Sequence, residues 1–224
     1  MSINTVLFDL DGTLVDSLDD LTDAVNHIRS VFAHPPLAAS DVRAMVGKGS
    51  RYLVRRALLA CSPQELEHAL QLFIDFNTRH IVDKSRFYPG VVEMLQHLHD
   101  SGIRLAVISN KHEALSRLIL CALGIHDMFE NISGGDTFSE RKPSPLPLLG
   151  VIELLGSTPE ECCMVGDSIN DIQAGTHAGI TTIGCGWGYG SHEELCSAAH
   201  HADSVPELLT ILELLASSGN RGTI

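Results

Sequence analysis

From residue 88 onward, the sequence alternates short apolar runs with longer amphipathic stretches, and glycine or proline separates most of them. The short runs predict buried strands at 103–108, 131–133, 162–165 and 181–183. The longer stretches have helical spacing at about 90–101, 112–123, 145–155, 169–178 and 205–216. This alternation predicts an α/β fold, a doubly wound parallel sheet with helices on both faces.

An all-helical block interrupts the alternation near the start of the chain. A short apolar run at 6–8 predicts a buried first strand, which the turn pair Asp11-Gly12 follows. Helical spacing then covers 16–33, about 41–60 and about 63–82, with Gly47-Lys48-Gly49 inside or beside the second stretch. We therefore expect residues 1–15 and 87–224 to form the sheet-containing core, and residues 16–86 to form an inserted helical cap.

The chain is acidic, with 15 Lys and Arg against 28 Asp and Glu, and a formal net charge of −13. Such a surface repels nucleic acid and anionic lipid, so neither is expected as a partner. No apolar run approaches the roughly 18 residues of a membrane span. The first residues lack the basic and apolar segments of a signal peptide, and the six cysteines form no C-x-x-C pair. These features are typical of a cytoplasmic protein with reduced thiols, and both a monomer and a homodimer stay open.

Reactive side chains follow the ends of the predicted strands. In chain order they are Asp9 and Asp11, Ser109 and Asn110, Lys142, and Asp167 and Asp171. Because the carboxyl ends of parallel strands meet at one rim, we expect these side chains to share a crevice. Carboxylates held close together repel one another unless a cation lies among them, and an all-oxygen site suits Mg²⁺. With a lysine and hydroxyl groups opposite, such a rim fits phosphoryl transfer, in which one aspartate attacks phosphorus and a second exchanges protons.

Taken alone, each motif also has a structural explanation. Asp-Gly is a common turn pair, Lys142 before Pro143 fits an exposed loop lysine, and Gly47-Lys48-Gly49 fits a structural turn. The run 184–190, which has glycine at every second position, predicts a flexible loop near the cap. The occurrence of all the strand-end motifs in one chain favours the functional interpretation.

Four segments together resemble the motifs of the haloacid dehalogenase superfamily of phosphatases. They are Asp9-Leu10-Asp11-Gly12-Thr13-Leu14-Val15, Ser109-Asn110, Lys142-Pro143-Ser144-Pro145 and Gly166-Asp167-Ser168-Ile169-Asn170-Asp171. The resemblance implies a Rossmann-like core, dependence on Mg²⁺ and a phosphorylated aspartate. It implies that Asp9 is the nucleophile and that Asp11 is the general acid and base. It also implies that Asp9, Asp11 and Asp167 bind the metal and that Asp171 orients metal-bound water or neighbouring groups. The implied phosphoryl-binding residues are Thr13, Ser109, Asn110 and Lys142.

Further segments resemble the bacterial phosphoglycolate phosphatases of that superfamily. They lie at 16–17, 42–49, 88–91 and 184–190. This closer resemblance implies hydrolysis of a small phosphorylated acid, 2-phosphoglycolate, to glycolate and phosphate. The cap loop would close over the substrate, with contacts from Gly47, Lys48, Gly49 and Arg51. Lys48 and Arg51 are then candidates for binding the substrate carboxylate.

Other functions use similar residues. Other small-molecule phosphatases share the core motifs, as does a sugar phosphomutase, which returns the phosphoryl group to its product instead of releasing it. A signalling receiver domain also carries a phosphorylated aspartate, a Ser or Thr and a lysine on a doubly wound sheet. Receivers are much shorter and lack a large helical insertion after the first strand, so residues 16–86 argue against this function.

Overall fold

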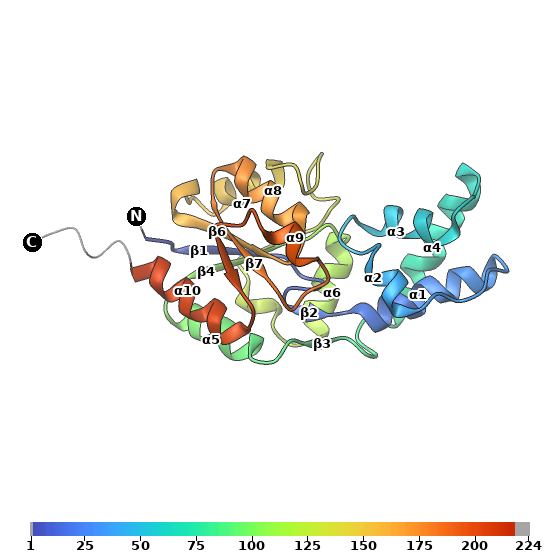
Figure 1. Ribbon diagram of the computed structural model, residues 1–224, viewed down its shortest axis with the longest axis horizontal. Helices are drawn as coiled ribbons and strands as arrows, with labels where there is room; N and C mark the ends of the chain where they lie inside the picture. Colours follow the sequence, from blue (N-terminus) through green and yellow to red (C-terminus); the bar gives the residue numbers. More distant parts are fainter. Residues whose placement is uncertain (1, 218–224) are drawn as a thin grey trace, which may run out of the picture.

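The computed structural model describes residues 2–217 of the chain, and a parallel sheet of six strands forms its centre (Figure 1). The strands lie side by side in the order β5 (Asn131–Ser133), β4 (Arg104–Ile108), β1 (Thr5–Phe8), β6 (Cys162–Gly166), β7 (Thr181–Cys185) and β8 (His200–Ala202). All five pairings are parallel. The predicted α/β, doubly wound parallel sheet is confirmed.

The two central strands bring the site residues to one edge of the sheet. Every residue of β1 and β6 is buried, as expected for strands covered on both faces. In the register of the sheet, Phe8 of β1 lies opposite Val107 of β4 and Val165 of β6. Because the three strands run in the same direction, the polar residues that follow them emerge together.

Helices cover both faces of the sheet. On one face α5 (Val91–Asp100), α6 (Glu113–Ala122) and α10 (Val205–Ser217) pack against a hydrophobic cluster that includes Val6 and Phe8. On the other face α7 (Leu146–Leu154) and α8 (Ile169–Ala178) pack against a cluster that includes Leu7. Successive residues of β1 thus point to opposite faces. Figure 1 shows α7 and α8 above the sheet and α5 and α10 below it.

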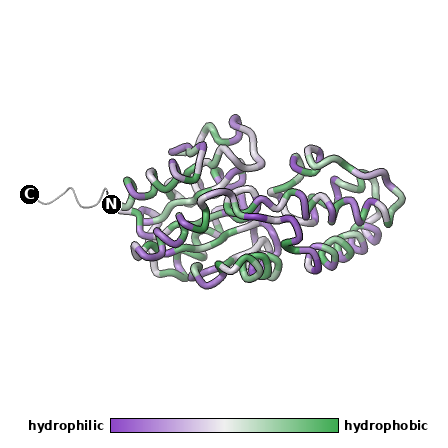
Figure 2. Tube along the Cα trace, turned by 90° about the horizontal axis from the view of Figure 1, so that it is seen from below, coloured by the Kyte–Doolittle hydropathy of each residue, from purple (hydrophilic) through white to green (hydrophobic). Residues whose placement is uncertain are grey.

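Four helices form a separate bundle at one end of the molecule (Figure 1). They are α1 (Leu18–Val31), α2 (Ala39–Arg43), α3 (Ser50–Leu58) and α4 (Pro63–Arg79), and they enclose their own hydrophobic cluster. Along these helices purple and green alternate in Figure 2, as expected for amphipathic helices with one face in a core. None of the helices within residues 2–217 is both long and apolar enough to span a bilayer.

A short antiparallel ladder connects the bundle to the sheet. Its strands are β2 (Val15–Asp16) and β3 (Arg86–Phe87), so the chain leaves and re-enters the core at neighbouring positions. The predicted limits of the helical insertion, residues 16 and 86, are opposite each other in this ladder. We propose residues 16–86 as a cap over the sheet edge, and we call this region the cap from here on.

Several short elements differ from the sequence-based expectations. The helix expected at about 41–60 is two helices, α2 and α3, because Gly47 and Gly49 between them have positive φ angles of 94° and 84°. The strand at 181–185 is not the last, since α9 (His192–Leu195) and β8 follow it. The 3₁₀ turns η1 (His126–Met128) and η2 (Pro159–Glu161) were also not expected. These short elements consist mostly of polar residues, so neither an apolar run nor a helical periodicity marks them in the sequence.

Candidate active site

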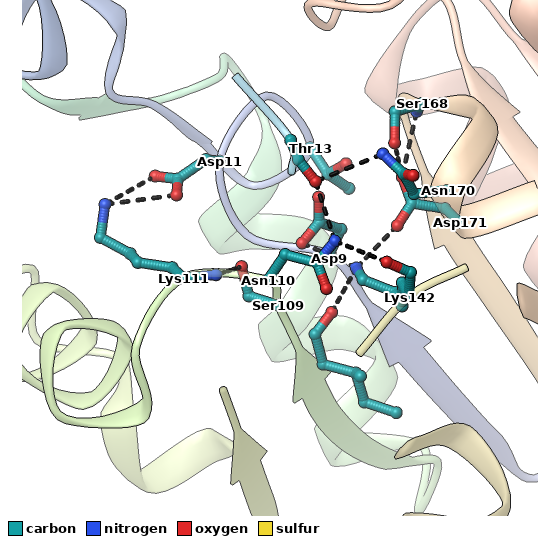
Figure 3. A network of polar contacts seen from close by, with 12 residues as sticks. Asp9, Asp11, Thr13, Ser109, Asn110, Lys111, Lys142, Ser168, Asn170 and Asp171 are labelled. Carbon is teal, nitrogen blue, oxygen red and sulfur yellow. Dashed lines mark hydrogen bonds and ion pairs between the residues drawn. The ribbon is translucent and has the colours of Figure 1, made fainter. Parts of the chain in front are cut away.

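Three buried aspartates gather at the carboxyl ends of the central strands. Asp9 follows β1, Asp167 follows β6, and Asp171 lies in the first turn of α8. Each offers a carboxylate oxygen within 4.8 Å of those of the other two. Asp171 Oδ2 accepts hydrogen bonds from the Ser168 amide (3.0 Å) and hydroxyl (2.7 Å), which fix its side chain at the helix start. The sequence motifs thus meet as predicted, with Asp171 inside the cluster (Figure 3).

One buried lysine supplies the positive charge next to this cluster. Lys142 Nζ lies 3.0 Å from Asp9 Oδ1 and 2.6 Å from Asp171 Oδ1, and it donates a hydrogen bond to the Ile108 carbonyl at 2.5 Å. The alternative of an exposed loop lysine is wrong, because Lys142 is 3% exposed. Burial alone would lower the pKa of Lys142, but the carboxylates of Asp171 and Asp9 outweigh it, so the pKa is raised and the ammonium persists.

The cluster carries more negative charge than Lys142 balances. Burial raises the pKa of Asp9 to about 6, with Lys142 opposing and Asp171 adding to the shift. Burial, followed by repulsion from Asp9 and Asp171, raises the pKa of Asp167 to about 8. Asp9 Oδ1 is an ion-pair partner of Lys142 by distance, yet it accepts no hydrogen bond from the described residues. A buried, incompletely satisfied, all-oxygen site of excess negative charge fits a divalent cation such as Mg²⁺.

Asp11 lies at the same rim but is directed elsewhere. Its carboxylate accepts a hydrogen bond from the Ser17 hydroxyl at 2.6 Å, and both of its oxygens lie 3.2 Å from Lys111 Nζ. Figure 3 shows the Asp11 side chain pointing toward Lys111 and away from the group around Asp9. Lys111 is a site residue that the sequence analysis missed, because nothing in its local pattern shows a contact with a residue 100 positions earlier.

The predicted phosphoryl-binding residues surround the aspartate cluster. The Thr13 hydroxyl donates to Asp167 Oδ1 at 3.1 Å, and the Ser109 hydroxyl accepts from the Lys111 amide at 3.2 Å. Asn110 Nδ2 donates to the carbonyl oxygens of Lys142 and Gly47, both at 2.9 Å. The side-chain amide of Asn110 therefore joins the lysine loop of the core to the glycine loop of the cap.

The cap loop at residues 47–49 lies directly on the core. Besides Asn110, Asn170 Nδ2 donates to the Gly47 carbonyl at 3.3 Å. A Cβ atom at Gly49 would lie 3.0 Å from the Asn110 carbonyl oxygen and closer still to Arg141, so a side chain at Gly49 would press the cap loop away from the core. The structure thus brings Gly47 and Gly49 to the site.

The two basic candidates of the cap have different surroundings. Lys48 lines a cavity of about 120 Å³, together with Asp11 and Asp167, and its ammonium lies 5.3 Å from the centre of the Tyr52 ring. Arg51 forms an exposed ion pair with Glu67 of the cap. Lys48 therefore shares a cavity with Asp11 and Asp167, whereas Arg51 does not line it.

The glycine-rich run 184–190 is part of the site and is held by several hydrogen bonds. The Tyr189 amide donates to Asp167 Oδ2 at 2.6 Å, and the Tyr189 hydroxyl accepts from the Ser17 amide at 2.7 Å. A Cβ atom at Gly188 would lie 2.2 Å from that of Asp167. The expectation of a flexible loop misses these contacts. The repeated glycines were the available signal, because they allow the backbone to approach a buried carboxylate closely.

The same run is also attached to the cap. Arg43 Nε donates to the Tyr189 carbonyl at 3.2 Å, Arg43 also donates through Nη2 to the Gly188 carbonyl, and its guanidinium lies 5.8 Å from the centre of the Tyr189 ring. Arg43 was another residue that sequence reasoning did not select.

A buried carboxylate beside an ammonium and a cation site can act as a nucleophile toward a phosphorus centre, and the surrounding donors can bind phosphoryl oxygens.

Comparison with known proteins gives consistent results. Residues 6–185 match the family of haloacid dehalogenase-like hydrolases. The chain is 38% identical over 203 residues to a phosphoglycolate phosphatase of Psychrobacter arcticus, covering 87% of this chain and 88% of the relative. It is 39% identical over 216 residues to a phosphoglycolate phosphatase of Chromobacterium violaceum, covering 94% and 97%. A crystal structure of a predicted phosphoglycolate phosphatase from Haemophilus somnus superimposes with a TM-score of 0.89 at 30% identity, covering 94% of this chain and 98% of that one.

Proposed function

The chain belongs to the haloacid dehalogenase-like hydrolase family, and from this membership we propose that it is a Mg²⁺-dependent phosphatase that hydrolyses 2-phosphoglycolate to glycolate and phosphate through a phosphorylated Asp9. The observation that carries the proposal is the position of Asp9, a buried carboxylate. One of its oxygens lies 3.0 Å from a buried ammonium and accepts no hydrogen bond from residues 2–217. The relatives with 38–40% identity, which are phosphoglycolate phosphatases, support the substrate.

In this mechanism Asp9 attacks the phosphorus atom, and the bond between phosphorus and the glycolate oxygen breaks. Lys142 pairs with Asp9 and keeps its carboxylate ionised next to the phosphoryl group. The Thr13 and Ser109 hydroxyls and the Asn110 amide would bind phosphoryl oxygens. Mg²⁺, held by Asp9, Asp167 and the backbone carbonyl of Asp11 with Asp171 orienting its surroundings, would neutralise charge on the phosphoryl group.

Asp11 is the proton carrier in this mechanism. It donates a proton to the leaving oxygen of glycolate and later accepts one from the water that cleaves the phosphorylated Asp9. Because its carboxylate is paired with Lys111 and Ser17 in the structure, Asp11 has to turn toward Asp9 to do so. The cap, including Gly47, Lys48, Gly49 and Arg51, would cover the substrate and exclude bulk water during the first step.

The proposal is tested by release of inorganic phosphate from a panel of phosphomonoesters with and without Mg²⁺. The panel contains 2-phosphoglycolate, sugar phosphates, nucleotides and pyrophosphate. We expect Mg²⁺-dependent release and a preference for 2-phosphoglycolate of about ten-fold or more, equivalent to about 1.4 kcal/mol in the transition state. A flat profile would exclude the named substrate, and movement of label between sugar positions with little free phosphate would show a mutase instead.

A further inference from the structure

A second, smaller cavity lies between the cap and the core, beside the site already described. Its volume is about 40 Å³, and apolar side chains from both regions form most of its wall: Leu21, Leu53 and Phe73 of the cap, and Leu115 of the core. The cap residues Val46 and Gly47 line both this cavity and the larger one next to Asp167, so the two are neighbours. We call it the seam cavity.

Asn77 and Lys111 reach the seam cavity from opposite sides, and Ser50 of α3 also lines it. Asn77 of α4 is 2% exposed and makes no side-chain hydrogen bond with any residue in the described part of the chain, and its Oδ1 is a buried acceptor without a donor. Leaving such a group unsatisfied destabilises the fold. An unpartnered amide among leucine and phenylalanine side chains is therefore expected to have a partner in the working protein.

Lys111 supplies the opposite, core-side wall. Its side chain is 8% exposed, and its ammonium donates to both oxygens of Asp11 at 3.2 Å. An ammonium has three donors, and the two contacts that the described residues provide come from one carboxylate. The seam cavity thus combines a cation, an amide and an apolar wall, and Asp11 forms its link to the reaction site.

We propose that Lys111 and Asn77 bind the carboxylate of the substrate's leaving group in the seam cavity. This inference rests on the proposed function and deepens it, because it assigns the residues that recognise glycolate. An anion matches the ammonium, and the side-chain amide of Asn77 provides further N–H donors. A cavity needs about 10–15 Å³ to hold one water, so the 40 Å³ of the seam cavity leaves room for a group as small as a carboxylate.

The position of the seam cavity suits the leaving group. Asp11 is the residue that must protonate the leaving oxygen, and Asp11 contacts Lys111 directly. When a substrate carboxylate binds Lys111, it replaces Asp11 as the partner of the ammonium, so the Asp11 side chain is released to turn toward Asp9. A substrate with a carboxylate beside its phosphate would thereby free its own proton donor, whereas an analogue that lacks the carboxylate would leave Asp11 paired.

The earlier candidates for this role have other partners. The Lys48 ammonium lies over the Tyr52 ring, and Arg51 pairs with Glu67 within the cap. Neither lines the seam cavity, whereas Lys111 does. The structure therefore favours Lys111 over both for the carboxylate.

The test compares two substrates in the same variant, so that general effects on the chemistry cancel. Ethyl phosphate has the length of 2-phosphoglycolate but a methyl group in place of the carboxylate. We expect wild-type kcat/KM to favour 2-phosphoglycolate by about ten-fold or more, and Lys111→Met to reduce that ratio by about ten-fold.

Asn77→Leu should reduce the ratio by about three-fold, and Lys111→Arg should keep most of it. Asn77→Asp should lower kcat/KM for 2-phosphoglycolate while raising it for phosphoethanolamine, because the new carboxylate attracts an ammonium.

Lys84→Met is the matched control, since Lys84 is an exposed lysine that pairs with Asp23. If Lys84→Met and Lys111→Met both keep the wild-type ratio, the inference is overturned while the proposed function stands. A loss of the ratio in Lys48→Met or Arg51→Met, with the ratio of Lys111→Met unchanged, would show that the substrate carboxylate binds in the larger cavity or at the cap surface. That result would also overturn the inference. A wild-type ratio near one would contradict both 2-phosphoglycolate as the substrate and the role of the seam cavity. Should Lys111→Met fail to fold, Asn77→Leu and Asn77→Asp decide the question.

Discussion

Two lysines, one at the sheet edge and one where the cap meets the core, each pair with an aspartate of the first motif, and their surroundings differ. Lys142 is fixed by Asp9, Asp171 and the Ile108 carbonyl, all within 3.0 Å. Among the described residues Lys111 has a single carboxylate partner, Asp11, at 3.2 Å, beside a cavity. Three short contacts hold the Lys142 ammonium in place beside the nucleophile. The one longer contact of Lys111 leaves its ammonium free to exchange Asp11 for a substrate carboxylate.

The largest expected effect is at the sheet edge. Asp9→Asn removes the nucleophile, so kcat for phosphate release should fall by at least about 10⁴-fold. The fold should persist, because the substitution removes one of three carboxylates that repel one another. Phosphate release and the thermal midpoint, measured on the same preparation, check both points. Turnover close to wild type in a folded variant would contradict the assignment of Asp9.

The second-largest expected effect is a difference in folding stability between variants of the two lysines. Lys142→Met leaves Asp9 and Asp171 buried without their counter-ion and should reduce the free energy of unfolding by about 3–5 kcal/mol. Lys111→Met should reduce it by about 1–2 kcal/mol, between the values for exposed and for buried pairs. Urea unfolding of both variants measures the difference. Equal losses would mean that the two surroundings are alike in energy and that the comparison is wrong.

The pH dependence of the metal-free protein should also reflect the sheet edge. The pKa of Asp9 is raised to about 6 and that of Asp167 to about 8, both above the values in the unfolded chain. This contribution to stability is complete below the ordinary aspartate pKa of 3.8. It is lost as the pH rises from there to about 6 for Asp9 and to about 8 for Asp167. Thermal unfolding in a chelator should show a falling midpoint over this range.

Added Mg²⁺ should restore the midpoint, and more so at about pH 8 than at about pH 5, because it competes with protons for the same oxygens. A Mg²⁺ effect that is equal at both pH values would show that the metal binds away from the aspartate cluster.

The smallest effect is expected where the cap holds the glycine-rich run. Arg43→Ala removes the hydrogen bonds to the Gly188 and Tyr189 carbonyls and should raise KM by about three-fold, with kcat little changed, since the cap would close less often on the substrate. The free energy of unfolding should change by about 1 kcal/mol or less. Arg56→Ala, at an exposed position of α3, is the control. A large loss of kcat in Arg43→Ala would place Arg43 in the chemical step instead.

The sequence allowed prediction of the sheet edge but not of the contact between cap and core. Asp9, Ser109 and Asp167 could be grouped because each directly follows an apolar strand, and parallel strands end at one rim. Lys111 and Asn77 could not, since neither has a local pattern that shows where its side chain lies. Their placement depends on how the helical bundle rests on the sheet, which no periodicity within either segment records.

The loop interactions were unpredictable for a related reason. Tyr189 bonds to Ser17, 172 positions away, through its hydroxyl group, and a single tyrosine in a glycine-rich stretch has no feature that shows this. The short strand β8 was missed because its sequence, His200-His201-Ala202, contains no apolar run. The paired glycines Gly47 and Gly49 did mark a turn, but only the structure shows that the turn lies against Asn110.

The ladder between β2 and β3 has an evolutionary consequence. Val15 lies opposite Phe87, so the seventy-odd residues between them start and finish at adjacent positions of one hydrogen-bonded pair, about 5 Å apart. A segment of another size or fold whose ends meet at that spacing could replace them without altering the register of the six-stranded sheet. The cap's share of substrate preference can then change while the bond-breaking residues at the sheet edge stay in place.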